Sequence, residues 1–277
     1  MTLIDPLSST IDRDEFTTAW SEWRDANEAR RRDPYGYLSY SAVYRLDSTP
    51  QRVVGIPGSW SIDADGPVVE LGEGEHLVID DRQTSGTVRF GAVAEREFRR
   101  AARFGDIVVE LSQRGGVQLL RPIDPQYGLR DDYVETPAYA PDPTWLVRGE
   151  FVPFDRPRDT EIDAALSGIT HHHDAVGEVV FELGGLEHRL LILEGVGGAT
   201  FAPFRDATSG VTTYGASRTL AVTLPATAGP AVLDFNRAAN LQCAYTDFAP
   251  CPLAPAQNRL PVAIEAGEQT PVFREAR

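Results

Sequence analysis

The sequence predicts a mostly β protein, with antiparallel sandwich- or barrel-like sheets in two lobes and an N-terminal amphipathic α-helix. Short segments of apolar residues alternate with Gly- and Asp-containing turns over most of the chain, which is typical of strands. Few helical patterns occur after residue 34. Strands that follow one another without intervening helices favour antiparallel sheets. The 277 residues suffice for two β-rich lobes that share one compact unit.

A helix is predicted over residues 12–32. Asp12 is followed three residues later by a glutamate, which resembles a capping box with Asp in place of Ser or Thr. Phe16, Trp20 and Trp23 then recur every three or four residues, so both tryptophans lie on one helical face. That face is either a packing surface or a ligand box, and packing is the simpler interpretation.

Strands and one further helix are predicted after the first helix. The predicted strands cover residues 68–71, 77–79, 87–90, 107–111, 145–152, 179–183, 189–193, 219–224, 232–235 and 260–264, and a short helix covers 94–103. The proline-rich segment 136–143 cannot support a central strand and marks a boundary between lobes. The predicted division is therefore 1–34, 35–135 and 136–277.

The composition excludes several classes of function. The net charge of −15 makes nucleic acids and anionic membranes poor partners, whereas a small molecule remains open. All 26 basic residues are arginine, which excludes a Schiff-base lysine, a P-loop lysine and a catalytic Ser-Lys pair. No apolar run approaches the roughly 18 residues that span a bilayer, so we expect a cytoplasmic protein. The sequence assigns no cofactor and no oligomeric state.

Motifs for common catalytic and metal centres are missing. The sequence has no nucleophile elbow, no dinucleotide-binding glycine pattern and no zincin helix. Of the consecutive residues His171, His172 and His173, at most two can face one metal from a strand, so we predict a polar turn and no metal site. Cys243 and Cys251 are eight positions apart and are interpreted as buried thiols, a disulfide, or reactive or metal-binding thiols.

The first candidate stretch for a site is 204–218. A turn containing Asp206 leads to a predicted strand on which Tyr214 and Arg218 share a face. With Arg205, these side chains suit a carboxylate or phosphoryl ligand. A buried Arg–Asp pair that braces a hairpin explains the same residues equally well.

The second candidate stretch is 234–258, which lacks any regular period. A loop of this length in a compact domain is functional or disordered, and its aromatic residues argue against disorder. Polar residues cluster here just after a predicted strand, where a scaffold can hold them rigidly. They are Asp234, Asn236, Arg237, Asn240 and Cys243, and the candidate ligand-binding residue Asn258 lies farther along the same stretch.

These stretches carry three ordered motifs. They read F-x-D-x-T-x-G-x-x-T-Y-x-x-x-R over 204–218, D-F-N-R-A-x-N-x-x-C-A-Y over 234–245 and C-P-L-x-P-x-x-N-x-L over 251–260. In these motifs the chain resembles the DUF1684 family, a bacterial and archaeal group of unassigned function. With looser similarity at 121–125 and 139–145, the resemblance extends over most of the chain. It is similar in particular to actinobacterial members, which carry a comparable Trp-rich helix.

Three positions depart from the family pattern. Ala239 replaces a common aromatic, Leu241 a common proline and Gln257 an expected glutamate, which argues against a catalytic carboxylate at 257. The resemblance assigns no activity, but it implies that the two stretches form one site.

Three hypotheses follow. The first is an enzyme for a small polar or anionic substrate, with an arginine and tyrosine anion site, Asp234 as acid or base, and Cys243 with the asparagines lining the pocket. The second is a non-catalytic ligand-binding or sensor domain that uses the same pocket. The third is a buried polar network that is purely structural.

Overall fold

Three antiparallel sheets and one long N-terminal helix form the framework of residues 12–275, the part that the computed structural model describes. Residues 1–11 of the predicted first segment lie outside the described residues. The chain divides into two units, the second formed by Arg31–Tyr133 together with Thr246–Pro250. The first unit contains α1 as far as Arg30, Val134–Tyr245 and the chain from Cys251 onward. The short segment 246–250 therefore leaves the first unit and returns to it.

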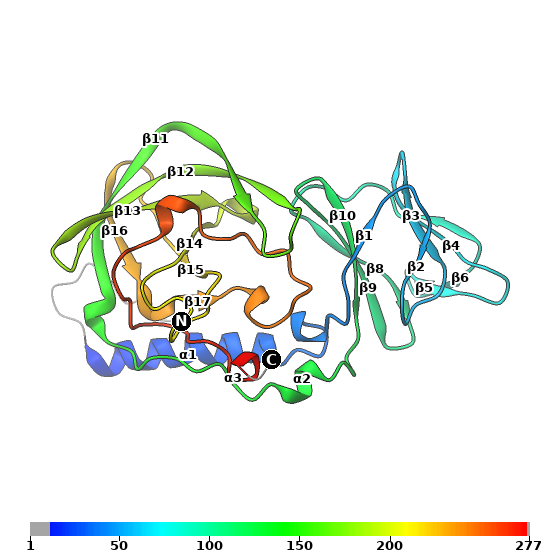
Figure 1. Cartoon of the computed structure of the whole chain (residues 1–277), viewed down its shortest axis with the longest axis horizontal. Helices are drawn as coiled ribbons and strands as arrows, with labels where there is room; N and C mark the ends of the chain where they lie inside the picture. Colours follow the sequence, from blue (N-terminus) through cyan, green and yellow to red (C-terminus); the bar gives the residue numbers. More distant parts are fainter. Residues whose placement is uncertain (1–11, 276–277) are drawn as a thin grey trace. The chain divides into compact units, whose positions relative to one another are not determined.

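Helix α1 (Arg13–Arg31) begins at the predicted cap. The Asp12 carboxylate accepts hydrogen bonds from the main-chain nitrogens of Asp14 and Glu15, at 2.9 and 3.1 Å. The helix lies alongside the sheet of the first unit (Figure 1). Trp20 is buried and its indole N–H donates to the Asn236 carbonyl at 3.0 Å, so this part of the tryptophan face is a packing surface.

The first unit contains a seven-stranded sheet in the order β16-β11-β12-β13-β14-β15-β17. Its strands are β11 (Leu146–Asp163), β12 (Thr170–Leu183), β13 (Leu186–Glu194), β14 (Thr200–Phe204), β15 (Arg218–Ala221), β16 (Gly229–Asp234) and β17 (Ala239–Asn240). Alternate residues of β13 serve different clusters. Leu190 and Ile192 belong to the main core, and Leu191 and Leu193 belong to a smaller cluster. Both faces of this sheet are thus partly covered.

The second unit packs two sheets around one core. The six-stranded sheet contains β1 (Tyr44–Leu46), β10 (Val117–Ile123), β9 (Ile107–Arg114), β8 (Phe98–Phe104), β5 (Leu77–Ile79) and β6 (Arg82–Thr84), in that order. The four-stranded sheet contains β2 (Gln51–Arg52), β3 (Ser59–Asp63), β4 (Gly66–Glu70) and β7 (Thr87–Arg89). Trp60 and Val69 from the smaller sheet share a core with Val109 and Leu120 from the larger one, which is sandwich packing.

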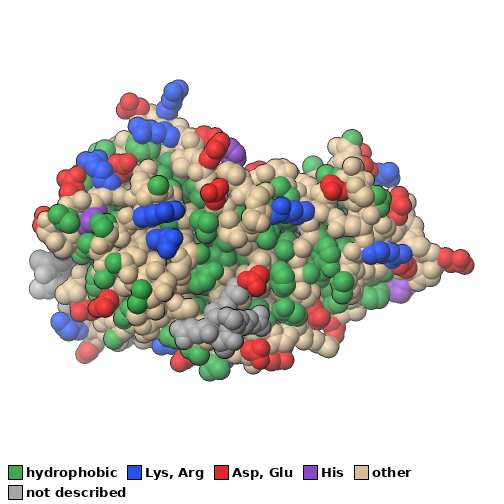
Figure 2. Space-filling model, in the orientation of Figure 1, with side chains coloured by type: hydrophobic (Ala, Val, Ile, Leu, Met, Phe, Trp, Pro, Cys, Tyr) green, Lys and Arg blue, Asp and Glu red, His purple; other side chains and the backbone are tan. Residues whose placement is uncertain are grey.

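The remaining elements are short. They are α2 (Leu129–Asp132), α3 (Val272–Glu275) and the 3₁₀ helices η1 (Tyr37–Ser39), η2 (Pro143–Trp145), η3 (Val196–Gly198), η4 (Phe235–Arg237), η5 (Gln242–Ala244) and η6 (Ala256–Asn258). In the described part of the chain, no helix combines the length and the apolarity needed to cross a membrane. Acidic and arginine side chains are interspersed on the face shown in Figure 2.

The helix predicted over 94–103 is wrong, because residues Phe98–Phe104 form strand β8. Their Ala and Arg residues favour a helix locally, but tertiary pairing overrides that preference. β8 pairs with the buried strand β9 from Phe98 opposite Ser112 to Phe104 opposite Ile107. Gly105, with φ of 58°, lies in the turn that joins the two strands.

The polar turn predicted at His171–His173 is also wrong, because these residues lie in β12 and pair with β11. The strand alternation places His171 and His173 in buried positions. His172 points the other way, and its Nδ1 lies 3.1 Å from the carboxylate of Asp159.

Two further predicted strand segments are irregular. Tyr214 precedes β15, which begins only at Arg218, and residues 260–264 form no strand although Leu260 and Ile264 are buried. The segment after Ile264 passes close to η4, and at Gly267 the approach leaves no room for a side chain. A Cβ atom there would lie 2.5 Å from the Ala238 carbonyl oxygen.

We predict that Gly267→Ala destabilises the protein much more than Gly185→Ala. Both glycines have φ near +75°, so each alanine costs about 1–2 kcal/mol of backbone strain. At Gly185 no described atom lies within 4 Å of the added Cβ, whereas at Gly267 the clash adds about 1–3 kcal/mol. Urea unfolding of the two variants measures the difference, and equal losses of stability would contradict the close approach.

Candidate functional site

The two candidate stretches lie side by side in the first unit. Arg218 of β15 pairs with Asn240 of β17. The Tyr214 hydroxyl donates to the Cys243 carbonyl at 2.8 Å. Farther along, the main-chain N–H of Arg205 donates to the Asn258 carbonyl at 3.0 Å. The structure thus brings the stretches 204–218 and 234–258 into one neighbourhood.

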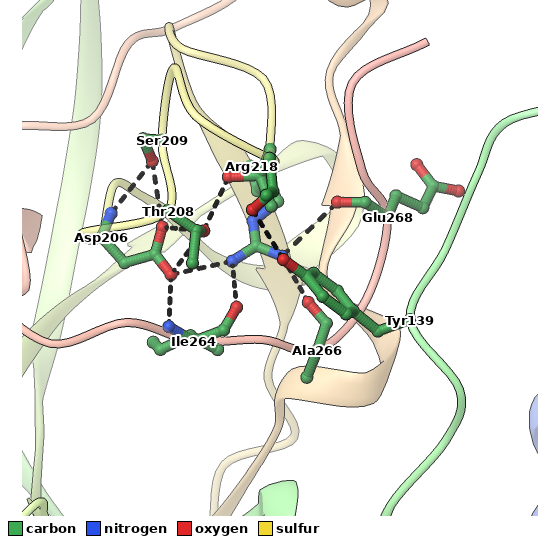
Figure 3. A network of polar contacts seen from close by, with 10 residues as sticks. Tyr139, Asp206, Thr208, Ser209, Arg218, Ile264, Ala266 and Glu268 are labelled. Atoms are coloured by element: carbon green, nitrogen blue, oxygen red, sulfur yellow. Dashed lines mark hydrogen bonds and ion pairs between the residues drawn. The ribbon is translucent and has the colours of Figure 1, made fainter. Parts of the chain in front are cut away.

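Arg218 lies at the centre of this neighbourhood and is 1% exposed. Its guanidinium donates to the main-chain carbonyls of Ile264 at 3.1 Å, Ala266, and Glu268 at 3.5 Å (Figure 3). It also forms an ion pair with Asp206 at 3.1 Å. Burial lowers its pKa, although Asp206 opposes that shift. Of the three guanidinium nitrogens of Arg218, Nε alone has no hydrogen-bond partner among the described residues.

Asp206 connects that arginine to a tight turn. Its carboxylate accepts from the hydroxyls of Thr208 and Ser209, at 2.8 and 3.0 Å, and from the main-chain N–H of Ile264 at 2.8 Å. Thr208 in turn shares a hydrogen bond of 2.8 Å with Thr213. Every one of these groups belongs to the protein itself, so the carboxylate is already saturated with donors.

The side chains of the three candidate asparagines all form hydrogen bonds with main-chain groups. Asn258 bonds to both the N–H and the carbonyl of Leu191, at 2.7 and 3.0 Å. Asn236 makes the same pair of bonds with Asp142, at 2.8 and 3.0 Å. The Asn240 amide donates to the Gln269 carbonyl at 2.8 Å. All three are buried, and their side chains replace a missing strand partner.

Glu268 belongs to the same neighbourhood and escaped the sequence analysis. It is 1% exposed, and its carboxylate accepts from the Asn240 N–H at 2.7 Å and the Tyr245 hydroxyl at 3.3 Å. Thr136 bonds to that same hydroxyl at 2.9 Å. No motif marks a single glutamate in a polar segment, so only the tertiary structure identifies it.

Asp234 is the most accessible acid of the candidate residues. It is half-buried at the end of β16, accepts from the Asn236 N–H at 3.1 Å and pairs with Arg237 at 3.3 Å. Burial raises its pKa, and the contacts with Asn236 and Arg237 only partly oppose the shift. Arg205 is also half-buried. A partly reachable carboxyl with a raised pKa is suited to proton transfer.

Cys243 and Cys251 form a second close pair, and both are buried thiols that are not joined by a disulfide. The main-chain N–H of Cys243 donates to the Cys251 sulfur at 3.3 Å. The hydrogen bond between the two thiols, together with burial, raises the pKa of Cys243. This thiol is therefore protonated and a poor nucleophile at neutral pH. Tyr214 is half-buried beside it.

Metal ligation has little support among residues 12–275. No group of three or more His, Cys, Asp or Glu side chains in this range is placed to hold a metal ion. The rings of His171 and His173 lie 5.8 Å apart, but they supply only two nitrogen ligands from one strand.

Comparisons with known proteins identify a family without an assigned activity. A family model described as a protein of unknown function, DUF1684, matches residues 131–269, half of the chain. A solution NMR structure of an uncharacterized protein from Haloarcula marismortui is similar at 29% identity. That match covers 52% of this chain and 80% of the other, with a TM-score of 0.44. No curated protein matches.

We predict that Asp234→Asn gains stability relative to the natural protein as the pH rises from about 3 to 7. The raised pKa means that the folded protein holds this proton more tightly than the unfolded chain does. The stabilisation is complete below the ordinary value of 3.8 and is lost as the pH rises through the raised pKa. Asparagine does not titrate, yet it still accepts from the Asn236 N–H. Urea unfolding across the pH series tests this, and a difference that does not vary with pH would refute it.

Proposed function

We propose that this chain, which belongs to the DUF1684 family, uses its signature residues as an internal anchor that fixes an irregular C-terminal segment on the sheet. The observation that carries the proposal is the state of Arg218. Its guanidinium is buried and donates hydrogen bonds to the main-chain carbonyls of every second residue from 264 to 268. In this role the signature is structural, and any partner binds elsewhere on the protein.

Electrostatics favours the anchor over an anion site. An arginine that binds a substrate carboxylate or phosphate needs free donors that face solvent. Arg218 is already neutralised by Asp206, and a second anion would meet the Asp206 charge at close range. Removing either partner of a buried pair leaves an uncompensated charge, which costs about 3–5 kcal/mol. The pair is therefore suited to holding structure.

Other signature residues support the same role. Asn258 joins the third block to β13, and Asn236 joins the second block to the segment before η2. Trp20 connects α1 to the second block through the Asn236 carbonyl. Because this tryptophan is tied to the signature, we also propose that the chain groups with the family members that carry a Trp-rich N-terminal helix, the actinobacterial type.

A second candidate function is acid–base chemistry on a small polar substrate at Asp234. The raised pKa and the partial exposure of this carboxyl favour it. The nearby Arg237 is also partly exposed and could bind an anionic group of the substrate. In this alternative, Arg218 and Asp206 support the site without touching the substrate.

We predict that Arg218→Met and Asp206→Asn each destabilise the protein by about 3–5 kcal/mol, because each leaves one buried charge unpaired. Arg189→Met is the matched control. It removes an exposed arginine that pairs with Glu178 in the same sheet, and we expect little change in the urea midpoint. Equal effects of the buried and exposed substitutions would contradict the anchor.

A thermal-shift titration separates the anchor from an anion pocket. We expect inorganic phosphate and small dicarboxylates to raise the melting temperature of the natural protein no more than that of Arg218→Lys. This variant keeps the charge but loses the planar fork. Stabilisation of the natural protein that disappears in a folded Arg218→Lys variant would overturn the proposal in favour of an anion site.

A further inference from the structure

The pair formed by Cys243 and Cys251 is not used by the anchor described above. These are the two cysteines of the chain, and both are buried, at 4% and 8% exposure. The sulfur of Cys251 accepts a hydrogen bond from the main-chain N–H of Cys243 at 3.3 Å. The two thiols are also in hydrogen-bond contact with each other. The two cysteines are eight residues apart in the sequence, and no helix longer than η5 lies between them. The close approach of their sulfurs is therefore a result of tertiary folding.

Both cysteines are held in place by main-chain contacts. The Tyr214 hydroxyl donates to the Cys243 carbonyl at 2.8 Å. The Cys251 carbonyl accepts from the Ala165 N–H at 2.8 Å, next to the bridge between Ala164 and Pro252. Two sulfurs that are fixed in contact need little rearrangement to become covalently bonded.

The position of the pair in the chain is unusual. Segment 246–250 belongs to the second unit, whereas the chain on either side of it belongs to the first. Within the second unit, Phe248 packs against a cluster that includes Tyr40 and Ile123. Cys243 and Cys251 therefore flank this segment, three positions before it and one position after it. We call the point where the two flanking cysteines meet the neck of segment 246–250.

We propose that Cys243 and Cys251 form an intramolecular disulfide by exchange with a low-molecular-weight disulfide, and that this bond closes the neck of segment 246–250. The inference goes beyond the anchor, since it concerns a covalent modification and a small-molecule co-reactant. It gives the chain a redox-dependent state without any loss of the Arg218 contacts.

The exchange proceeds in two balanced steps. The Cys251 thiol loses its proton, and its sulfur attacks one sulfur of the small disulfide, breaking the S–S bond and releasing one small thiol. The Cys243 N–H that points at the Cys251 sulfur favours the required thiolate. The Cys243 thiolate then attacks the Cys251 sulfur of the mixed disulfide and releases the second small thiol. The two protein thiols lose two electrons, the small disulfide gains them, and both protons leave on the released thiols.

Burial sets the rate of this reaction. The small disulfide reaches the sulfurs only when the neck opens locally, and the raised pKa of Cys243 keeps its thiol protonated in the closed state. The pair therefore resists brief exposure to an oxidant and responds to a sustained change in the thiol–disulfide balance.

The test uses the full chain, fully reduced and incubated with oxidised glutathione at neutral pH. Thiols are counted after unfolding in denaturant, and the intact mass is measured. We expect the count to fall from two to zero, with a loss of two hydrogen atoms and no retained glutathione. The same chain incubated in urea is the positive control for the oxidant. Cys251→Ser is the negative control, because it cannot lose the two hydrogen atoms.

Two results would overturn the proposal. One is a folded natural protein that keeps both thiols after the urea-unfolded chain has been oxidised. The other is a glutathione adduct that persists on the natural protein. Hydrogen exchange tests the neck itself, since we expect the amides of residues 246–249 to exchange severalfold more slowly in the oxidised form. Oxidation that leaves their exchange unchanged would refute closure of the neck.

Discussion

The structure of the first unit depends on the burial of one positive charge. A guanidinium that is removed from water must be neutralised and must have its donors satisfied. At Arg218 the Asp206 carboxylate neutralises the charge, and main-chain carbonyls of residues 264–268 accept from the two terminal nitrogens, so that only Nε lacks a partner. The Ile264 N–H completes the link by donating to the same carboxylate. The segment therefore cannot leave the sheet without removing the carbonyl acceptors of the buried guanidinium, and this constraint sets the path of the chain over the site.

The same need explains why so many side chains bond to main chain in this region. After β16 the chain has only the two-residue strand β17, so most of its peptide groups lack a sheet partner. Buried peptide groups still require hydrogen bonds. Asn236 and Asn258 each supply both a donor and an acceptor to one peptide segment, as a neighbouring strand would. The Ser217 hydroxyl accepts from the Ala254 N–H at 2.7 Å in the same way. The polar residues of the motifs are thus substitutes for a regular sheet.

The sequence predicted the features that depend on local pattern. The cap at Asp12, the buried strands such as β9 and the irregularity of 234–258 all follow from residue spacing and turn chemistry. Prediction from the sequence failed where contacts with residues distant in the chain determine the local structure. Phe98–Phe104 became a strand through its pairing with β9. Glu268 could not be predicted, because its partners Asn240 and Tyr245 are more than twenty positions away. The motifs indicated which residues gather, but not whether their hydrogen bonds point inward or toward a ligand.

That direction divides the motif residues into two chemical classes. Asp206, Arg218, Asn236 and Asn258 have bonds to the protein at most of their side-chain polar atoms, so they have little capacity left for a substrate. Asp234 differs, because it is half-buried and its pKa is raised by burial. The two thiols also differ, since a hydrogen bond between sulfurs is weak and leaves both able to form a covalent bond. Most residues of a motif can therefore be required for folding, while only a few of them are available for reaction with another molecule. Any activity of this fold has to come from the groups whose reactive atoms folding has not already used.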